Sequence, residues 1–181
     1  MKIGFDVDGV LYPWHDIVYD YIVQELKVKC TYEEFCQAVI NDAFSEIFMN
    51  NIVKNPILVT KRSIEPSIKK MLWDLSKQNE IFYVTARPKE VVLSTHKWFK
   101  DSAVPYLENV FIATDDNKVP FILKHDIDIF VEDRDKYIRA LQEYTQIIVV
   151  KKLWNQHLWD EFPCINHVTE LPEKLRVLAW I

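Results

Sequence analysis

Short apolar segments recur along the chain and alternate with longer amphipathic stretches. Five of these segments are rich in β-branched and aromatic residues and therefore predict strands. They cover residues 2–6, 81–84, 110–113, 127–131 and 147–150. Most are nearly continuous apolar runs, which indicates strands buried on both faces, as in a parallel sheet covered by helices.

The stretches between the later strands carry helical periodicity. The apolar positions of residues 66–75 recur at helical spacing, and a similar pattern covers residues 91–99. Shorter helical patterns lie at residues 119–124 and 135–144. This alternation predicts an α/β fold with an open, mostly parallel Rossmann-like sheet flanked by helices.

The interval between the first and second strands does not fit this alternation. Residues 16–52 have a wholly helical pattern, which is too long for a single crossover, and Thr31 with Glu34 forms a capping box within it. We therefore expect a small helical cap inserted after the first strand. The predicted division is a core of residues 1–11 and 66–181, and a cap with its return linker at residues 12–65.

Composition narrows the classes of partner. The chain has 181 residues, of which 49% are hydrophobic, so it can bury the core of one domain. Its formal charge is −5, and no run of Lys or Arg is longer than two. Extended nucleic acid is a poor fit, because that affinity comes from neutralising many phosphates. A small-molecule substrate fits better.

Several sequence patterns that the chain lacks bear on its expected location in the cell and on its cofactors. The N-terminus has no signal-peptide pattern and no apolar run reaches about 18 residues, so we expect a cytoplasmic protein without a membrane partner. The three cysteines lack the spacing of a zinc site or a disulfide framework. The only glycines, Gly4 and Gly9, cannot supply a Walker A loop or a dinucleotide-binding motif.

The first strand ends in two acids and a glycine. Asp6 and Asp8 are spaced i, i+2, and Gly9 allows the chain to turn, so that both carboxylates can face one crevice at the carboxyl edge of the sheet. Oxygen ligands in such a place can hold a hard cation such as Mg²⁺. A solvated acidic turn would give the same short string, so this segment alone does not decide the function.

Polar residues at the ends of the later strands add to this picture. Thr85 follows the second strand, Lys118 lies shortly after the third, and Glu132 and Asp133 close the fourth. A crevice outside the carboxyl ends of parallel strands is where open α/β proteins bind ligands. A hydroxyl, a cation and several acids gathered there are suited to phosphoryl transfer, in which charge on the phosphoryl oxygens must be neutralised.

These segments resemble the four ordered motifs of the haloacid dehalogenase superfamily. The matching strings are Asp-Val-Asp-Gly-Val-Leu from Asp6, Val-Thr-Ala-Arg-Pro around Thr85, the lysine Lys118, and Val-Glu-Asp ending at Asp133. Within the superfamily, the chain is similar to cytosolic-type 5′(3′)-deoxyribonucleotidases and related proteins, chiefly through Thr-Ala-Arg-Pro and Glu-Asp-Arg. The resemblance implies a phosphatase that acts through an aspartyl phosphate.

The resemblance also implies roles for individual residues. Asp6 would attack phosphorus, and Asp8 would protonate the leaving oxygen and then deprotonate water. Mg²⁺ would be held by Asp6, the backbone carbonyl of Asp8 and Asp133. Thr85 and Lys118 would bind the phosphoryl oxygens.

Several assignments stay open at this point. Either Glu132 or Asp133 is the direct metal ligand, with Asp133 preferred and Glu132 in a supporting position, and Asp135 is a further candidate. Lys124 is the alternative to Lys118. Asp115 and Asp116 are expected to cap the helix that follows them.

Substrate choice is expected to depend on the cap and the loop after the first strand. Tyr12 and Trp14 could stack on a base, or they could pack the cap against the core. Arg87 could reach a phosphate or lie on the surface of the next helix. The segment 151–155, which ends in Trp-Asn, is expected to be structural.

The leading hypothesis is therefore a phosphatase of nucleoside monophosphates, with a preference for deoxyribonucleotides as one possibility. One alternative is a phosphatase for another small ester or for a nucleic acid 3′-phosphate. Another is a binding module that keeps the fold without turnover. The sequence does not choose between these substrates, and it does not indicate an oligomeric state.

Overall fold

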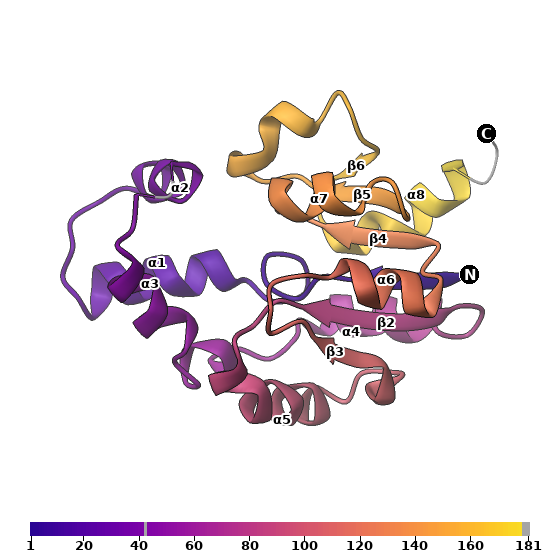
Figure 1. The fold of residues 1–181 in the computed structure, drawn as a ribbon, viewed down its shortest axis with the longest axis horizontal. Helices are drawn as coiled ribbons and strands as arrows, with labels where there is room; N and C mark the ends of the chain where they lie inside the picture. The colour runs from indigo at the N-terminus through magenta and orange to yellow at the C-terminus, as the bar shows by residue number, and fades with distance from the viewer. Residues whose placement is uncertain (42, 179–181) are drawn as a thin grey trace.

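A six-stranded parallel sheet forms the centre of the computed structural model, which describes residues 1–41 and 43–178 (Figure 1). The strand order is β3-β2-β1-β4-β5-β6, and every neighbouring pair is parallel. The strands are β1 (Lys2–Phe5), β2 (Glu80–Thr85), β3 (Val110–Ile112), β4 (Ile129–Glu132), β5 (Gln146–Val150) and β6 (Cys164–Ile165). The predicted α/β fold with an open parallel sheet is confirmed.

All five predicted strands are present, and their bounds differ by one or two residues from the expected ones. The fourth begins at Ile129 rather than at residue 127. The sixth strand was not predicted, because its two residues, Cys164 and Ile165, are too few to carry a hydrophobic pattern. It pairs with the end of β5 and extends the sheet by one edge strand.

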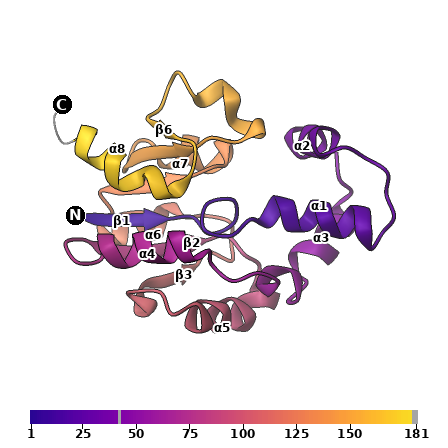
Figure 2. The same cartoon turned by 180° about the vertical axis from the view of Figure 1, so that it is seen from behind.

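Helices cover both faces of the sheet. Alternate residues of the strands point to two separate apolar clusters: in β4, Ile129 and Val131 join one cluster and Phe130 joins the other. The first cluster lies against α4 (Pro66–Leu75), α5 (Val92–Ser102) and α8 (Leu171–Leu178), and the second against α6 (Val119–His125) and α7 (Asp135–Leu141). Figures 1 and 2 show these two layers from opposite sides.

The direction of strand addition reverses at β1. The chain places β2 and then β3 on one side of β1, and β4, β5 and β6 on the other. The loops that leave the carboxyl ends of β1 and β4 therefore diverge, and a crevice opens between them. The residues that directly follow β1 lie at this point.

Between β1 and α4 the chain forms three α-helices rather than one continuous helical run. They are α1 (Trp14–Gln24), α2 (Tyr32–Ile40) and α3 (Glu46–Val53), followed by the 3-10 helix η1 (Leu58–Thr60). The expectation of a wholly helical stretch over residues 16–52 was too broad, because residues 25–31 form a connection in which Lys27 has a positive φ. The predicted capping box is present, since Thr31 and Glu34 exchange hydrogen bonds.

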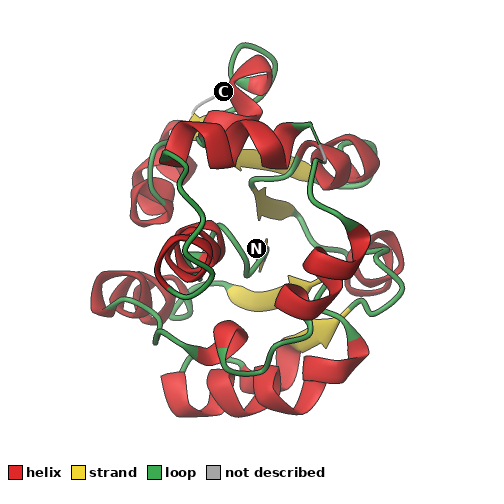
Figure 3. Ribbon diagram, turned by 90° about the vertical axis from the view of Figure 1, so that its left-hand side faces the viewer, coloured by secondary structure: helices red, strands yellow, loops and turns green. Residues whose placement is uncertain are grey.

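These helices lie beyond the carboxyl edge of the sheet, and Figure 3 views the molecule from that side. Tyr12 fixes their near end to the core: its hydroxyl donates to the carbonyl of Leu58, and its ring packs edge-on against Trp98, with 5.2 Å between centroids. The Trp98 indole in turn donates to the carbonyl of Arg62 at 2.7 Å. The division into core and cap stays a prediction, and residues 179–181 of that core lie outside the described residues.

The remaining short elements lie mainly in the second half of the chain. They are the 3-10 helices η2 (Lys89–Val91), η3 (Leu107–Asn109), η4 (Leu153–Leu158) and η5 (Val168–Glu170). Among the described residues, no helix is both long enough and apolar enough to span a membrane.

Candidate functional site

The loop after β1 holds two carboxylates at the mouth of the crevice. The backbone amide of Asp6 continues the ladder by donating to the carbonyl of Val131 at 2.9 Å. The next residues form a closed turn, in which Gly9 has a φ of 97° and donates to the carbonyl of Tyr12 at 2.8 Å. A side chain at this φ would be strained, so the glycine allows the turn that places Asp6 and Asp8 together.

A buried lysine joins the ends of β1 and β4. The ammonium of Lys118 donates to Asp6 and to Glu132, both at 2.6 Å, and all three side chains are almost wholly buried. Lys118 reaches them from the N-terminus of α6, and the ring of Tyr137 lies 4.1 Å from its ammonium. A charge this deeply buried is stable only with such partners, so these contacts fix the position of the Asp6 carboxylate.

The second carboxylate oxygen of Glu132 accepts hydrogen bonds from the backbone. Its Oε1 accepts from the amides of Asp133, at 2.9 Å, and Arg134, at 3.1 Å, while Oε2 accepts from Lys118. These contacts hold the turn that follows β4. Both Glu132 oxygens already accept hydrogen bonds. Glu132 is therefore less suitable than Asp133 as a direct metal ligand.

Asp133 is the carboxylate that remains incompletely satisfied. Its Oδ1 is buried and has no hydrogen-bond partner within the described part of the chain. Asp6, Glu132 and Asp133 each offer an oxygen within 4.8 Å of the others, and they are a group of acids whose spacing fits a metal ion. Three buried carboxylates with one unsatisfied oxygen are a donor set that suits a hard cation.

Burial and mutual repulsion shift the pKa values of these groups. Burial and then the charge of Glu132 raise the pKa of Asp6 to about 7, although Lys118 acts in the opposite direction. Burial, Glu132 and Asp6 raise the pKa of Asp133 well above its ordinary value. Burial lowers the pKa of Lys118, but Asp6 and Glu132 outweigh it, so the lysine stays charged. The site thus holds more negative charge than Lys118 alone can balance.

The segment after β5 holds Asp133 in position through hydrogen bonds. The indole of Trp154 donates to Asp133 Oδ2 at 3.2 Å, and the Asn155 amide donates to the backbone carbonyls of Asp133 and Val150 at 2.8 and 2.9 Å. From the other side, a Cβ added to Gly9 would lie 2.2 Å from Asp133 Oδ2, so the turn and the carboxylate are in tight contact. These contacts agree with the expected structural role of residues 151–155. They also place Trp154 and Asn155 in direct contact with a residue of the site, Asp133.

Arg87 forms a bidentate ion pair with Asp8. Its Nε and Nη2 donate to the two Asp8 oxygens at 2.8 and 2.7 Å, and Nη1 donates to the Thr95 hydroxyl at 3.3 Å. The guanidinium lies 5.0 Å from the Tyr12 ring centroid and 5.4 Å from that of Trp98. Arg87 is buried, so the surface position considered for it was wrong, and the structure pairs it with an acid of the site.

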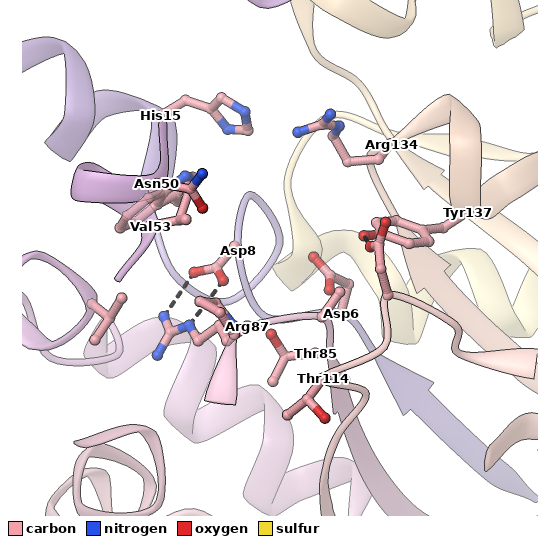
Figure 4. Close-up of a pocket in the computed structure, with 15 residues that line it drawn as sticks. Asp6, Asp8, His15, Asn50, Val53, Thr85, Arg87, Thr114, Arg134 and Tyr137 are labelled. Atoms are coloured by element: carbon pink, nitrogen blue, oxygen red, sulfur yellow. Dashed lines mark hydrogen bonds and ion pairs between the residues drawn. The ribbon is translucent and has the colours of Figure 1, made fainter. Parts of the chain in front are cut away.

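A cavity of about 440 Å³ opens beside these groups (Figure 4). Asp6, Thr85 and Thr114 lie on one side, and His15, Asn50 and Val53 of the helical segment lie on another. Its other lining residues are Asp8, Trp14, Val59, Ala86, Arg87, Pro88, Asp116, Arg134 and Tyr137. The cavity therefore has an acidic and hydroxyl-bearing end and a second end formed partly by the helical segment.

Comparison with solved structures identifies this architecture. No family model matches the chain. A haloacid dehalogenase-like hydrolase from Streptococcus pneumoniae superimposes with a TM-score of 0.64 over 99% of this chain and 97% of its own, at 14% identity. This chain has the haloacid dehalogenase fold.

Curated relatives point to the same group of proteins. A Bacillus cereus protein, provisionally named a nucleotidase, is 29% identical over 97% of this chain and 98% of its own length. A protein from Clostridium acetobutylicum, named a nucleotidase, is 23% identical over 86% of this chain and 83% of its own. The resemblance to nucleotidase-like members of the haloacid dehalogenase superfamily, which was inferred from four short motifs, is confirmed.

The strings that resemble the haloacid dehalogenase motifs meet at the carboxyl edge of the sheet, and several residues considered beside them do not take the positions considered for them. Lys118, and not the exposed Lys124, contacts Asp6. Asp135 does not join the acid cluster, because its carboxylate pairs with Arg139 at 3.3 Å. The expected capping of α6 by Asp115 and Asp116 is wrong, since Asp115 accepts from the amide of Asn117, before the helix, and Asp116 accepts from Lys136 and Tyr137 and lines the cavity.

Of the three residues suggested for substrate binding, two have other contacts in the structure. Tyr12 is 1% exposed and packs the helical segment against the core, which leaves no free ring face for a base. Arg87 is held by Asp8. Trp14, at the start of α1, is half-buried and lines the cavity, so it alone keeps the position that stacking requires.

Sequence reasoning missed several residues of the site. His15 and Arg134 line the cavity, although His15 was given no role and Arg134 was considered only as part of the Glu-Asp-Arg string. Adjacency to Trp14 and to Asp133 was the available signal. Trp154 could not have been placed beside Asp133, because the contact depends on how η4 folds back from β5.

Replacement of Lys118 by alanine should strongly destabilise the metal-free protein. The change leaves Asp6 and Glu132 buried without their cation, and breaking a buried pair typically costs about 3–5 kcal/mol. Urea unfolding followed by circular dichroism measures the loss. Lys124→Ala in the same helix is the control, and as an exposed substitution it should stay within about 0.5 kcal/mol of wild type. Equal effects of the two substitutions would contradict the buried ion-pair cluster.

The raised pKa of Asp6 predicts a pH-dependent stability without metal. The pKa of Asp6 in the folded protein, about 7, exceeds its ordinary value of 3.8. The stability that the protonated group contributes is therefore fully present below pH 3.8 and is lost as the pH rises through about 7. Asp6→Asn removes this group, so its free energy of unfolding relative to that of the wild type should increase between about pH 4 and about pH 7. A pH-independent difference in urea unfolding would show that Asp6 is ionised throughout.

Proposed function

We propose that this protein hydrolyses phosphomonoesters through an aspartyl phosphate on Asp6, with (deoxy)nucleoside monophosphates as substrates. A phosphatase of the haloacid dehalogenase type is supported by its hydrolase neighbours and its nucleotidase-named relatives. The observation that carries the proposal is the contact of Lys118 with Asp6 beside an incompletely satisfied Asp133. A positioned carboxylate nucleophile, a cation for the phosphoryl oxygens and a metal-binding acid thus lie together.

The donor set fits Mg²⁺. Asp6 and Asp133 would hold the ion through carboxylate oxygens, the Asp8 carbonyl would be a further ligand, and Glu132 would support Asp133 and Lys118 from behind. Bound Mg²⁺ would neutralise charge on the phosphoryl oxygens. It would also lower the repulsion between buried carboxylates that raises the pKa of Asp6.

In the first half-reaction, a carboxylate oxygen of Asp6 would form a bond to phosphorus while the ester P–O bond breaks. The departing alkoxide would take a proton from Asp8 and leave as an alcohol. The ammonium of Lys118 and the hydroxyl of Thr85 would contact the phosphoryl oxygens. Thr85 fits this role because its hydroxyl is buried beside the cavity and has no partner.

In the second half-reaction, water would replace the leaving alcohol. Asp8, now a carboxylate, would take a proton from the water as its oxygen bonds to phosphorus, and the bond between phosphorus and Asp6 would break. Inorganic phosphate and the free Asp6 carboxylate would result. The same side chain thus serves as acid and then as base.

The ion pair between Arg87 and Asp8 would have to change during this cycle. A carboxyl group that protonates the ester oxygen must point toward it, so Asp8 has to give up at least one of its two hydrogen bonds to Arg87. A substrate phosphate could compensate by accepting from the released guanidinium. Arg87 would therefore hold Asp8 aside until a phosphoryl group arrives.

The leaving group would occupy the end of the cavity formed by the helical segment. Trp14 offers an aromatic face there, which suits a nucleobase, and the cavity has room for a small ester. The names of the relatives support a nucleotide over other esters. An extended nucleic acid remains a poor fit with the formal charge of −5.

We expect phosphate release from deoxynucleoside monophosphates that requires Mg²⁺ and is abolished by chelator. Asp6→Asn should reduce kcat by at least about 1,000-fold, since it removes the nucleophile. Phosphate release from nucleoside monophosphates, sugar phosphates and a 3′-phosphorylated oligonucleotide is the measurement. Faster turnover of a sugar phosphate than of every nucleotide would reject the proposed substrate class, and no release from any ester would reject the proposed activity.

Trp154→Phe should weaken binding of Mg²⁺ about 10-fold to 100-fold, because Asp133 loses a hydrogen bond that orients it. Calorimetric titration of the protein with Mg²⁺ measures this directly. Trp73→Phe is the control, since it removes an indole hydrogen bond from an exposed tryptophan on α4. Equal affinities in both variants would mean that Asp133 does not depend on Trp154 for its orientation.

A further inference from the structure

His15 is a buried polar residue at the edge of the cavity. It is the second residue of α1, only 6% of its surface is exposed, and it lines the cavity. Its Nδ1 is fully buried and has no hydrogen-bond partner among the described residues. Unsatisfied polar atoms in such a place are uncommon, which calls for a partner that the protein itself does not supply.

The position of the ring is fixed by packing. His15 lies against the indole of Trp154, with 3.9 Å between ring centroids and 36° between their planes. Trp154 is itself held by its hydrogen bond to Asp133. In Figure 4, His15 faces Arg134 across the cavity and lies away from Thr85 and Thr114. The imidazole therefore lies on the side of the cavity away from the hydroxyls of Thr85 and Thr114.

The ring is neutral at physiological pH. Burial, followed by the positive charges of Arg134 and Lys152, lowers the pKa of His15 to about 3. A neutral imidazole has one N–H donor and one nitrogen acceptor, and it carries no charge to attract an anion. A hydroxyl, carbonyl or amide group matches this neutral donor and acceptor better than a second phosphate or a carboxylate does.

We propose that His15 is a specificity-determining residue that hydrogen-bonds a neutral polar group of the leaving alcohol. This inference rests on the proposed phosphatase function and specifies the other end of its substrate. The alcohol must carry a hydroxyl or amide-like group beyond the ester oxygen. A nucleoside meets this condition with its sugar hydroxyl and with its base edge.

The test compares His15→Phe with wild type on three esters. Phenylalanine keeps a ring against Trp154 and removes both nitrogens. Phenyl phosphate has no polar group on its alcohol, deoxyribose 5-phosphate adds hydroxyls, and a deoxynucleoside monophosphate adds a base. We expect kcat/KM to fall about fivefold to tenfold on the esters that reach His15, the usual effect of one neutral hydrogen bond, and to stay unchanged on phenyl phosphate.

The pattern across the esters identifies the group that is bound. Loss on both deoxyribose 5-phosphate and the nucleotide would assign a sugar hydroxyl, whereas loss on the nucleotide alone would assign the base edge. Partial recovery in His15→Asn, whose amide can replace one ring nitrogen, would support either assignment. Parallel loss on all three esters, or no loss on any, would overturn the proposal. His96→Phe, at an exposed position of α5, is the matched control.

A binding measurement separates this inference from the proposed activity. In the Asp6→Asn background, calorimetric titration with a deoxynucleoside monophosphate reports affinity without turnover. Weaker binding after His15→Phe would support the role of His15 even if the wild-type protein released no phosphate from any ester. Equal affinities, or no binding to either protein, would overturn it.

Discussion

The structure depends on the burial of three carboxylates around one lysine. Asp6, Glu132 and Asp133 come from two adjacent strands, and Lys118 contacts two of them. A group of like charges in a protein interior is costly unless cations and hydrogen-bond donors offset it. The backbone amides after β4, the indole of Trp154 and the lysine supply part of that compensation, and a bound cation would supply the rest.

The order of the strands makes this arrangement possible. Because β1 lies between β2 and β4, the end of β1 meets the ends of both neighbours, and Lys118 reaches it from the helix between β3 and β4. Residues separated by 112 positions therefore become direct partners. The helical segment is inserted immediately after Asp6 and Asp8, so the chain that carries the acids also forms one wall of the cavity.

Local pattern was sufficient for five of the six strands and for the residues at their ends. Apolar runs predicted five strands, and topology then brought Asp6, Thr85, Lys118 and Asp133 to one edge. It was not sufficient for side chains whose surroundings come from distant segments. In the sequence, Tyr12 is a possible stacking surface, but Leu58 and Trp98 enclose it. Arg87 could reach a phosphate or lie on the surface, but Asp8 pairs with it. Such contacts depend on the tertiary fold, which periodicity does not encode.

The aromatic pair of His15 and Trp154 links the two halves of the proposed site. His15 belongs to the first helix after β1, whereas Trp154 follows β5 and donates to Asp133. A ligand that moves His15 would therefore act on the residue that orients a proposed metal ligand. Leaving-group recognition and metal binding would then be energetically coupled, and by thermodynamic linkage the coupling would be equal in both directions. In this arrangement an ester whose alcohol contacts His15 would change the affinity of the site for a metal ion, because both depend on the same indole.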